Sequence, residues 1–418
     1  MLNETRPLCL TRRTLLGAAV ASAIAPISFA TAATAQPRRA AASPGPATGT
    51  RTPTPTRLTL PTPTGPHPIG TVWLRLVDRA RIDPWQDSRV ARELMVQLWY
   101  PTRGTHGHPF APWMLPAAVP FFEQAQGIPS GTLLLPTTHA QVAAPVDRGR
   151  CGRPVVLYSP GLRSDRSVGT LLVEELASHG YLVVAIDHTY DADQVAFPGG
   201  RVETFAVTGD VDDALIGKAL AVRTADTSFV LDQLTALNAG HNPDAGRRRL
   251  PPTLTGAFDL PRTGMLGHSL GGATAAAAMR ADRRLRAGVN LDGSLLSPAT
   301  AGTDRPFLLF GSDPGPGPED PSWDQFWASQ HGWKRELALM GSTHTSFTDL
   351  ETLLPQAAPA LGLTPSQVTQ AIGALDPYRA IHAQRDYVRA FFDLHLRHHD
   401  NHLLQAASSR YPQIRFIR

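Results

Sequence analysis

The sequence predicts an α/β fold in which a mostly parallel sheet of about eight strands is covered by helices on both faces. Two observations carry this prediction. From residue 154 onward, short continuous apolar runs alternate with longer helical patterns. One run leads through Gly267-His268-Ser269-Leu270-Gly271 directly into an alanine-rich helical stretch. Strands that alternate with helices pair in parallel, and ligands of such sheets bind at the carboxyl ends of the strands.

The expected strands and helices follow from the pattern of apolar residues and from the positions of proline and glycine. Two antiparallel strands come first, and Pro101 ends the second of them. The expected strands cover residues 71–77, 93–100, 154–159, 181–186, 264–268, 286–291, 306–310 and 335–340. Helices are expected at about 168–179, 212–237, 270–278 and 387–394, and Thr364 caps another helix that begins at Pro365.

Residues 102–147 form a long connection that proline and glycine interrupt and that carries Trp113 and Phe122. A connection of this length inside a compact domain is usually either functional or disordered. Two interpretations remain open at this stage. The aromatic side chains form a cap over an apolar substrate, or the segment is a partly helical excursion packed on the sheet.

The N-terminus has the features of an export signal. Arg12-Arg13 starts a twin-arginine pattern, an alanine-rich apolar run follows, and Ala33-Thr34-Ala35 offers a small-residue cleavage site. We therefore expect residues 1–35 to be a signal peptide, cleaved near Ala35, and the mature protein to be secreted or periplasmic. Residues 36–68 are rich in Pro and Thr and are expected to be a disordered linker, with one catalytic domain over residues 69–418.

Charge and cysteine content limit the remaining possibilities. The formal net charge is +4 over 418 residues and no basic block stands out, so nothing indicates a nucleic-acid partner. Cys9 lies in the signal, which leaves Cys151 without a partner for an internal disulfide. Cys151 is expected to be a small packing residue.

The pattern G-x-S-x-G between a strand and a helix is the nucleophile elbow, which presents a serine hydroxyl on a strained turn. A serine needs a base to accept its proton, and the base needs a carboxylate to orient it. In this fold the expected order is Ser, then Asp or Glu, then His. His344 directly follows an apolar strand and is the expected base for Ser269. Asp292 and Asp313 both end strands, and either position suits the acid.

Five stretches resemble the plasma and intracellular type II platelet-activating factor acetylhydrolase family of α/β hydrolases. They are residues 94–101, 158–162, 267–272, 291–293 and 344–349, with the sequences LMVQLWYP, YSPGL, GHSLGG, LDG and HTSFTD. The resemblance implies an acid on the earlier strand, at Asp292. It also implies an oxyanion hole made by the backbone N–H groups of Leu162 and Leu270.

The sequence thus predicts a secreted serine ester hydrolase without metal or organic cofactor. Short-chain or oxidised acyl esters, including phospholipid sn-2 acyl groups, are the expected substrates, with transient contact to lipid surfaces. A lipase or polyesterase of broad specificity is the alternative within this class, and a catalytically silent binding protein is the alternative outside it. The sequence does not indicate an oligomeric state.

Two further groups have both a chemical and a structural interpretation. Asp187 and His188 could form a second acid–base pair, but we expect them to line the pocket or to satisfy loop backbone. His395, His399 and His402 have helical spacing that suits a metal ion, but we expect them to be a polar helix end.

Overall fold

The computed structural model describes residues 54–86, 88–206, 211–315 and 320–418. The expected signal peptide with its cleavage site near Ala35, and residues 36–53 of the expected linker, lie outside the described residues.

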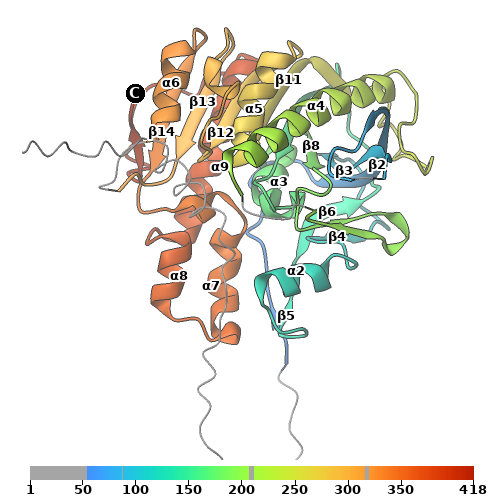
Figure 1. The fold of residues 1–418 in the computed structure, drawn as a ribbon, viewed down its shortest axis with the longest axis horizontal. Helices are drawn as coiled ribbons and strands as arrows, with labels where there is room; N and C mark the ends of the chain where they lie inside the picture. Colours follow the sequence, from blue (N-terminus) through green and yellow to red (C-terminus); the bar gives the residue numbers. More distant parts are fainter. Residues whose placement is uncertain (1–53, 87, 207–210, 316–319) are drawn as a thin grey trace, which may run out of the picture.

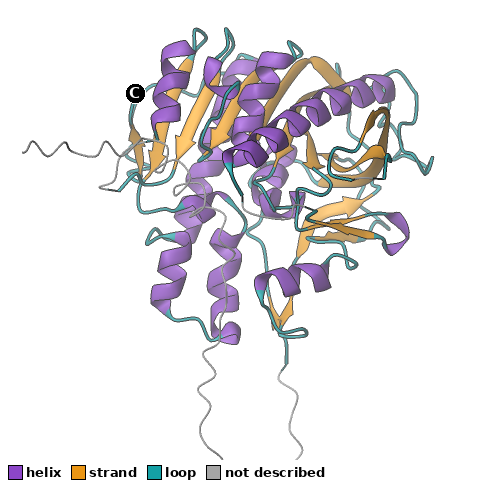
Figure 2. Cartoon of the chain, viewed as in Figure 1, coloured by secondary structure: helices purple, strands orange, loops and turns teal. Residues whose placement is uncertain are grey.

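A large mixed sheet forms the centre of the domain, with eleven strands in the described part of the chain (Figures 1 and 2). From one edge to the other the order is β15 (Ile414–Phe416), β14 (Lys334–Leu339), β13 (Phe307–Gly311), β12 (Leu285–Leu291), β11 (Phe258–His268), β7 (Arg153–Ser159), β8 (Leu182–Asp187), β3 (Ala91–Pro101), β2 (Ile69–Ile82), β6 (Thr137–Val142) and β4 (Phe110–Pro112). The strands from β14 to β8 in this order are all parallel, whereas β3 and β15 pair with them in antiparallel fashion. The predicted α/β architecture is therefore confirmed.

Helices cover both faces of this sheet. Side chains of α4 (Asp213–Asn238) and α5 (Leu270–Ala281) share one core with Val155 and Leu157 of β7. Side chains of α3 (Thr170–Ser178) and α9 (Pro377–Arg397) share the other core with Val156 and Tyr158. The alternation along β7 follows from the two-residue period of a strand, and because both faces are covered, both sets of side chains are apolar.

The smaller elements surround this body. The remaining helices are α2 (Val119–Gln126), α6 (Pro321–Ser329), α7 (Leu350–Leu361) and α8 (Pro365–Ile372), and the short strands are β1 (Thr56–Arg57), β5 (Leu133–Leu134), β9 (Gln194–Ala196) and β10 (Val202–Thr204). The Thr364 side chain accepts a hydrogen bond from the Gln367 N–H, which is the N-terminal cap predicted for α8.

The connection over residues 102–147 packs on the fold through two short strands and one helix. Its strands β4 and β6 extend the edge of the main sheet, and α2 lies over a small third core. Trp113 and Phe122 are buried there in edge-to-face contact, with ring centroids 5.7 Å apart. An apolar groove of about 450 Å³ separates this excursion from α7. The segment is thus partly helical and packed on the fold, and an aromatic cap over a substrate stays a prediction.

The expected boundary of the folded domain at Ile69 is wrong. Residues 54–68 already lie on the domain, because Leu58 and Leu60 are buried in the third core. The chain at Thr56 pairs in parallel with β5, and the Thr59 N–H donates to the Gln356 side chain of α7 at 2.9 Å. Two leucines within a Pro- and Thr-rich stretch supply enough apolar surface to hold it in place.

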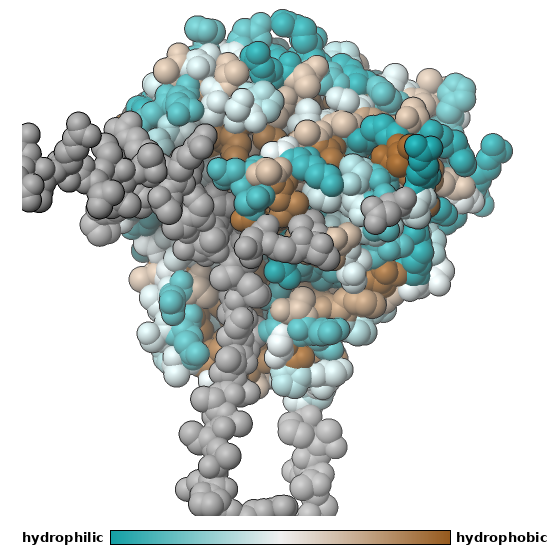
Figure 3. Space-filling model, in the orientation of Figure 1, coloured by the Kyte–Doolittle hydropathy of each residue, from teal (hydrophilic) through white to brown (hydrophobic). Residues whose placement is uncertain are grey.

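The surface carries few large apolar side chains. On the face seen in Figure 3, hydrophilic residues predominate and hydrophobic ones show between them in small patches. None of the helices in the described ranges is long and apolar enough to span a bilayer. Cys151 is exposed, so its expected role as a packing residue is wrong.

Candidate active site

Ser269 occupies the turn between β11 and α5, with φ 55° and ψ −125°. This backbone conformation is rare for a residue with a side chain, and such strain persists where the surroundings enforce it. The neighbouring glycines make the turn possible. A Cβ on Gly267 would lie 2.2 Å from the Gly271 carbonyl carbon, and one on Gly271 would lie 1.9 Å from the Ser159 carbonyl oxygen. The strand, turn and helix therefore have the geometry of a nucleophile elbow.

His344 and Asp292 are brought together at the same edge of the sheet. His344 opens the short 3₁₀ helix η4 (His344–Phe347) after β14, and Asp292 directly follows β12. The distance from His344 Nδ1 to Asp292 Oδ2 is 2.7 Å. The other Asp292 oxygen, Oδ1, accepts the Ser312 N–H at 2.6 Å. Burial opposes the charge on Asp292, but the hydrogen bond and charge of His344 outweigh it and lower the pKa of this carboxyl group.

Asp313, the other candidate acid, binds backbone. Its Oδ2 accepts the Gly341 N–H at 2.8 Å, and its Oδ1 accepts the Gly315 N–H at 3.0 Å. These bonds hold the two loops that follow β13 and β14. Of the two carboxylates that the sequence left open, the structure brings Asp292 to His344.

His268, the residue before the serine, connects the elbow to the His344 loop. Its Nε2–H donates to the His344 carbonyl oxygen at 3.0 Å, and the two imidazole rings have centroids 4.5 Å apart. Burial, followed by the charge of His344, lowers the pKa of His268 to about 3, so this ring stays neutral. No hydrogen bond joins Ser269 Oγ to the His344 ring among the described contacts, and such bonds are often long before substrate binds.

The two residues whose N–H groups are expected to form the oxyanion hole come from segments next to Ser269. Leu270 is the first residue of α5, where backbone N–H groups lack partners within the helix. Leu162 follows Gly161, and a Cβ built on Gly161 would lie 3.3 Å from Ser269 Cβ. In the described part of the chain neither N–H donates to a protein acceptor. Both donors are therefore available beside the serine.

Asp187 and His188 do not pair with each other. Asp187 accepts the Arg166 N–H at 2.7 Å and forms an ion pair with its guanidinium group. His188 lies between Ser159 and Asp226, at 2.9 Å from Ser159 Oγ and 3.0 Å from Asp226 Oδ2. Sequence reasoning missed this second buried group, although a helix that carries Asp226 among apolar residues was a usable signal.

A metal ion finds no preformed site in the described ranges, where no cluster of three His, Cys, Asp or Glu side chains has suitable geometry. His395, one of the three histidines with helical spacing, packs against Trp333 and Phe391. Burial lowers the pKa of His395 to about 4. These contacts are those of a packing residue.

The parallel sheet, the elbow and the paired His344 and Asp292 define this protein as an α/β hydrolase. The family model described as "Platelet-activating factor acetylhydrolase, isoform II" matches residues 54–410. The chain therefore belongs to this family, and the expected resemblance is confirmed.

Individual relatives are esterases. The probable 1-alkyl-2-acetylglycerophosphocholine esterase of Arthroderma benhamiae is 28% identical over 378 residues, which cover 84% of this chain and 92% of that protein. The platelet-activating factor acetylhydrolase of Cavia porcellus is 24% identical over 219 residues, or 47% of this chain and 48% of that one. Among solved structures, a ferulic acid esterase from Streptomyces cinnamoneus superposes with a TM-score of 0.71 and 36% identity, covering 86% of this chain and 99% of its own.

Proposed function

We propose that this protein is a serine carboxylic ester hydrolase with Ser269 as nucleophile, His344 as general base and Asp292 as the orienting acid. The observation that carries the proposal is the 2.7 Å contact between His344 Nδ1 and Asp292 Oδ2, on the loops next to the elbow. Because Asp292 engages Nδ1, the Nε2 atom of His344 is the nitrogen free to accept a proton.

The first half of the reaction acylates the enzyme. Ser269 Oγ forms a bond to the ester carbonyl carbon, the carbonyl π electrons move to the oxygen, and the hydroxyl proton passes to His344 Nε2. Asp292 stabilises the resulting imidazolium and keeps its own proton affinity low. When the tetrahedral intermediate collapses, the bond to the leaving alkoxide breaks and His344 returns the proton to it.

The second half releases the acid. Water attacks the acyl carbon and gives its proton to His344, and the bond from the acyl group to Ser269 Oγ then breaks as Oγ takes that proton back. In both halves the negative oxygen accepts hydrogen bonds from the N–H groups of Leu162 and Leu270. One such donor contributes about 3 kcal/mol to the stability of the transition state. These side chains and N–H groups supply the chemistry of both halves without a cofactor.

Esters with short or oxidised acyl chains are the proposed substrates, with the acyl group at the sn-2 position of a phospholipid as the specific case. Membership of the family and the name of the Arthroderma benhamiae relative, an esterase of 1-alkyl-2-acetylglycerophosphocholine, support this choice. Action on such lipids implies transient contact with a lipid surface.

A second candidate is hydrolysis of aromatic or other non-lipid esters by an esterase of broad specificity. The observation in its favour is the 36% identity to the ferulic acid esterase, which this chain matches over 99% of that structure. The triad is the same in both cases, so the acyl pocket decides between them.

A panel of substrates tests both candidates. It contains p-nitrophenyl esters from acetate to laurate, a phosphatidylcholine with an sn-2 acetyl group, and methyl ferulate. The main proposal expects the highest kcat/KM on the acetyl phospholipid and a fall with acyl length. A preference for methyl ferulate selects the second candidate. A wild-type protein that turns over none of these esters contradicts both and leaves a binding protein.

Export through the twin-arginine route, with cleavage near Ala35, places the mature enzyme outside the cytoplasm. Arg12-Arg13 and the small residues before Gln36 support this part of the proposal.

A further inference from the structure

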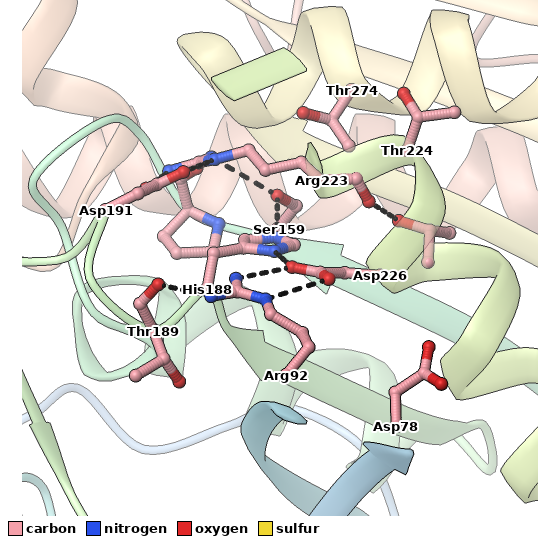
Figure 4. A network of polar contacts seen from close by, with 12 residues as sticks. Asp78, Arg92, Ser159, His188, Thr189, Asp191, Arg223, Thr224, Asp226 and Thr274 are labelled. Carbon is pink, nitrogen blue, oxygen red and sulfur yellow. Dashed lines mark hydrogen bonds and ion pairs between the residues drawn. The ribbon is translucent and has the colours of Figure 1, made fainter. Parts of the chain in front are cut away.

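A second Ser-His-Asp arrangement lies at the buried carboxyl ends of β7 and β8 (Figure 4). Ser159 Oγ, both ring nitrogens of His188 and Asp226 Oδ2 are linked by contacts of 2.9 and 3.0 Å. The Asp226 carboxylate is also paired with Arg92, at 2.7 Å from Nη2. All these side chains are 0% exposed, in contrast to His344, whose side chain is 25% exposed. No ester can reach Ser159, so this group has another role.

Arg223 joins this network to the loop that carries the oxyanion hole. It lies one turn before Asp226 on α4 and is also fully buried. Its Nε donates to Asp191 Oδ2 at 2.6 Å, and its Nη2 contacts the other oxygen of the same carboxylate. The two terminal nitrogens also donate to the carbonyl oxygens of Pro160 and Gly161, the latter at 3.0 Å.

The bond to Gly161 has a direct consequence for Leu162. The Gly161 C=O and the Leu162 N–H belong to one planar trans peptide and point in opposite directions. Because Arg223 holds the carbonyl toward α4, the N–H points away from α4. Gly161 lies close to Ser269, since a Cβ built on it would be 3.3 Å from Ser269 Cβ. The orientation of this one peptide therefore decides whether Leu162 can serve the oxyanion.

The rest of the loop is held through the same partners. Asp191, which binds Arg223, accepts the Arg163 N–H with its backbone carbonyl at 2.9 Å, and the Asp193 N–H donates to the Arg163 carbonyl at 2.9 Å. The Ser164 N–H also donates to the Gly161 carbonyl, at 3.2 Å. A flipped peptide would remove the Gly161 acceptor from Nη2 of the buried Arg223 and leave one of its N–H groups unpaired, which is costly.

We propose that Arg223, fixed by Asp191, is a positioning residue that orients the Gly161–Leu162 peptide so that the Leu162 N–H faces the developing oxyanion. This inference rests on the proposed esterase function. Arg223 does not touch the substrate, and it acts on the transition state through the Leu162 N–H. Its loss should therefore lower kcat more than it raises KM.

The test uses two variants of the full-length enzyme. The double variant R223M/D191N removes both charges and so avoids a buried unpaired ion. The single variant R223K keeps the ion pair but loses the fork that reaches two carbonyls. The matched control is R305M, because Arg305 donates to the carbonyls of Asp282 and Leu285 at the far end of α5.

Three quantities are measured for each variant on p-nitrophenyl acetate: kcat, KM, and the inhibition constant of a trifluoromethyl ketone, which binds as a tetrahedral oxyanion. Thermal unfolding by circular dichroism reports the change in stability. For R223M/D191N we expect kcat to fall by about 10- to 100-fold and inhibitor affinity to fall by the same factor, whereas KM should change by less than about threefold. The loss of kcat stays limited because the bond from the Ser164 N–H still holds the Gly161 carbonyl in part. R223K should lose about fivefold or more in the same two quantities.

R305M should lower the melting temperature yet leave kcat and inhibitor affinity within about twofold. The inference is overturned if the folded double variant keeps kcat and inhibitor affinity within about threefold of wild type. If the double variant does not fold, R223K decides by the same criterion. Failure of the esterase proposal looks different, because the wild type itself would then show no turnover.

Discussion

His344 Nδ1 lies 2.7 Å from Asp292 Oδ2, although the two residues follow strands β14 and β12, which are separated in the sheet by β13. Asp313, at the end of the intervening strand, binds the backbone of Gly341 and Gly315 instead. The acid thus reaches the base across a strand, and the residue between them supports the loops.

Replacement of the two carboxylates separates these roles. D292N should lower kcat on p-nitrophenyl acetate by about 10³- to 10⁴-fold, because the imidazole loses the partner that fixes its tautomer and stabilises its charge. D313N should keep kcat within about threefold, since Asp313 binds backbone and the amide oxygen still accepts one of its two N–H partners. Steady-state kinetics of both variants measure this, and a large loss in D313N with an active D292N would reverse the assignment.

His268 should make the free energy of unfolding decrease as the pH falls. Its pKa is about 3 in the folded protein and about 6.5 in the unfolded chain, so between these values the unfolded state binds more protons. Above about pH 6.5 His268 is neutral in both states and costs no stability. As the pH decreases toward 3, protonation of the unfolded chain lowers the free energy of unfolding.

H268Q keeps a donor for the His344 carbonyl but does not titrate. Urea unfolding at pH 7 and pH 5 should show that wild type loses about 2 kcal/mol more than H268Q over this interval. Equal losses in the two proteins would show that His268 does not stay neutral when buried.

Glu351, on α7 close to the His344 loop, should have the opposite pH dependence. Burial raises its pKa to about 8, against 4.5 for the ordinary group, so the folded state binds more protons in this interval. Its contribution is favourable below about pH 4.5 and is lost as the pH rises through 8.

E351Q mimics the protonated side chain. The free energy of unfolding of E351Q should exceed that of wild type by about 4 kcal/mol at pH 7.5 and nearly match it at pH 4.5. Chemical denaturation at the two pH values provides the measurement. A variant that is less stable than wild type at both would contradict the assignment of a neutral Glu351.

The proposed nucleophile and base could be predicted from the sequence better than the buried residues that hold the loops around them. Ser269 and His344 could be located because the elbow has a local pattern and the base follows an apolar strand. Asp292 could not be separated from Asp313 by local pattern, since both end parallel strands and the choice depends on how loops cross β13. Arg223 and Asp226 were not recognised because their partners are backbone carbonyls and side chains from distant elements.

The errors in the fold have similar causes. The sequence predicts a disordered linker up to residue 68 because Pro and Thr dominate this stretch. The burial of Leu58 and Leu60 depends on a core formed by residues far away in sequence, so the pattern does not reveal it. The edge strand β15 and helix α2 are short and carry little periodic signal.

The export proposal predicts that both arginines of the signal are needed. Replacing Arg12 and Arg13 together with lysine should abolish appearance of the mature protein outside the cytoplasm and leave the precursor inside. Cell fractionation with intact-mass analysis tests this, and a mature chain that starts near Gln36 is expected for wild type. An exported double-lysine variant would rule out the twin-arginine route.

The most direct test of the central claim is the site of covalent modification by a fluorophosphonate. Peptide mass mapping of the labelled wild type should find one added group, on the peptide containing Ser269, and S269A should remain unlabelled while it still folds. The buried Ser159 provides an internal comparison, because its peptide should carry no label in either protein. Labelling of S269A at wild-type rate, or an unreactive wild type, would contradict the account.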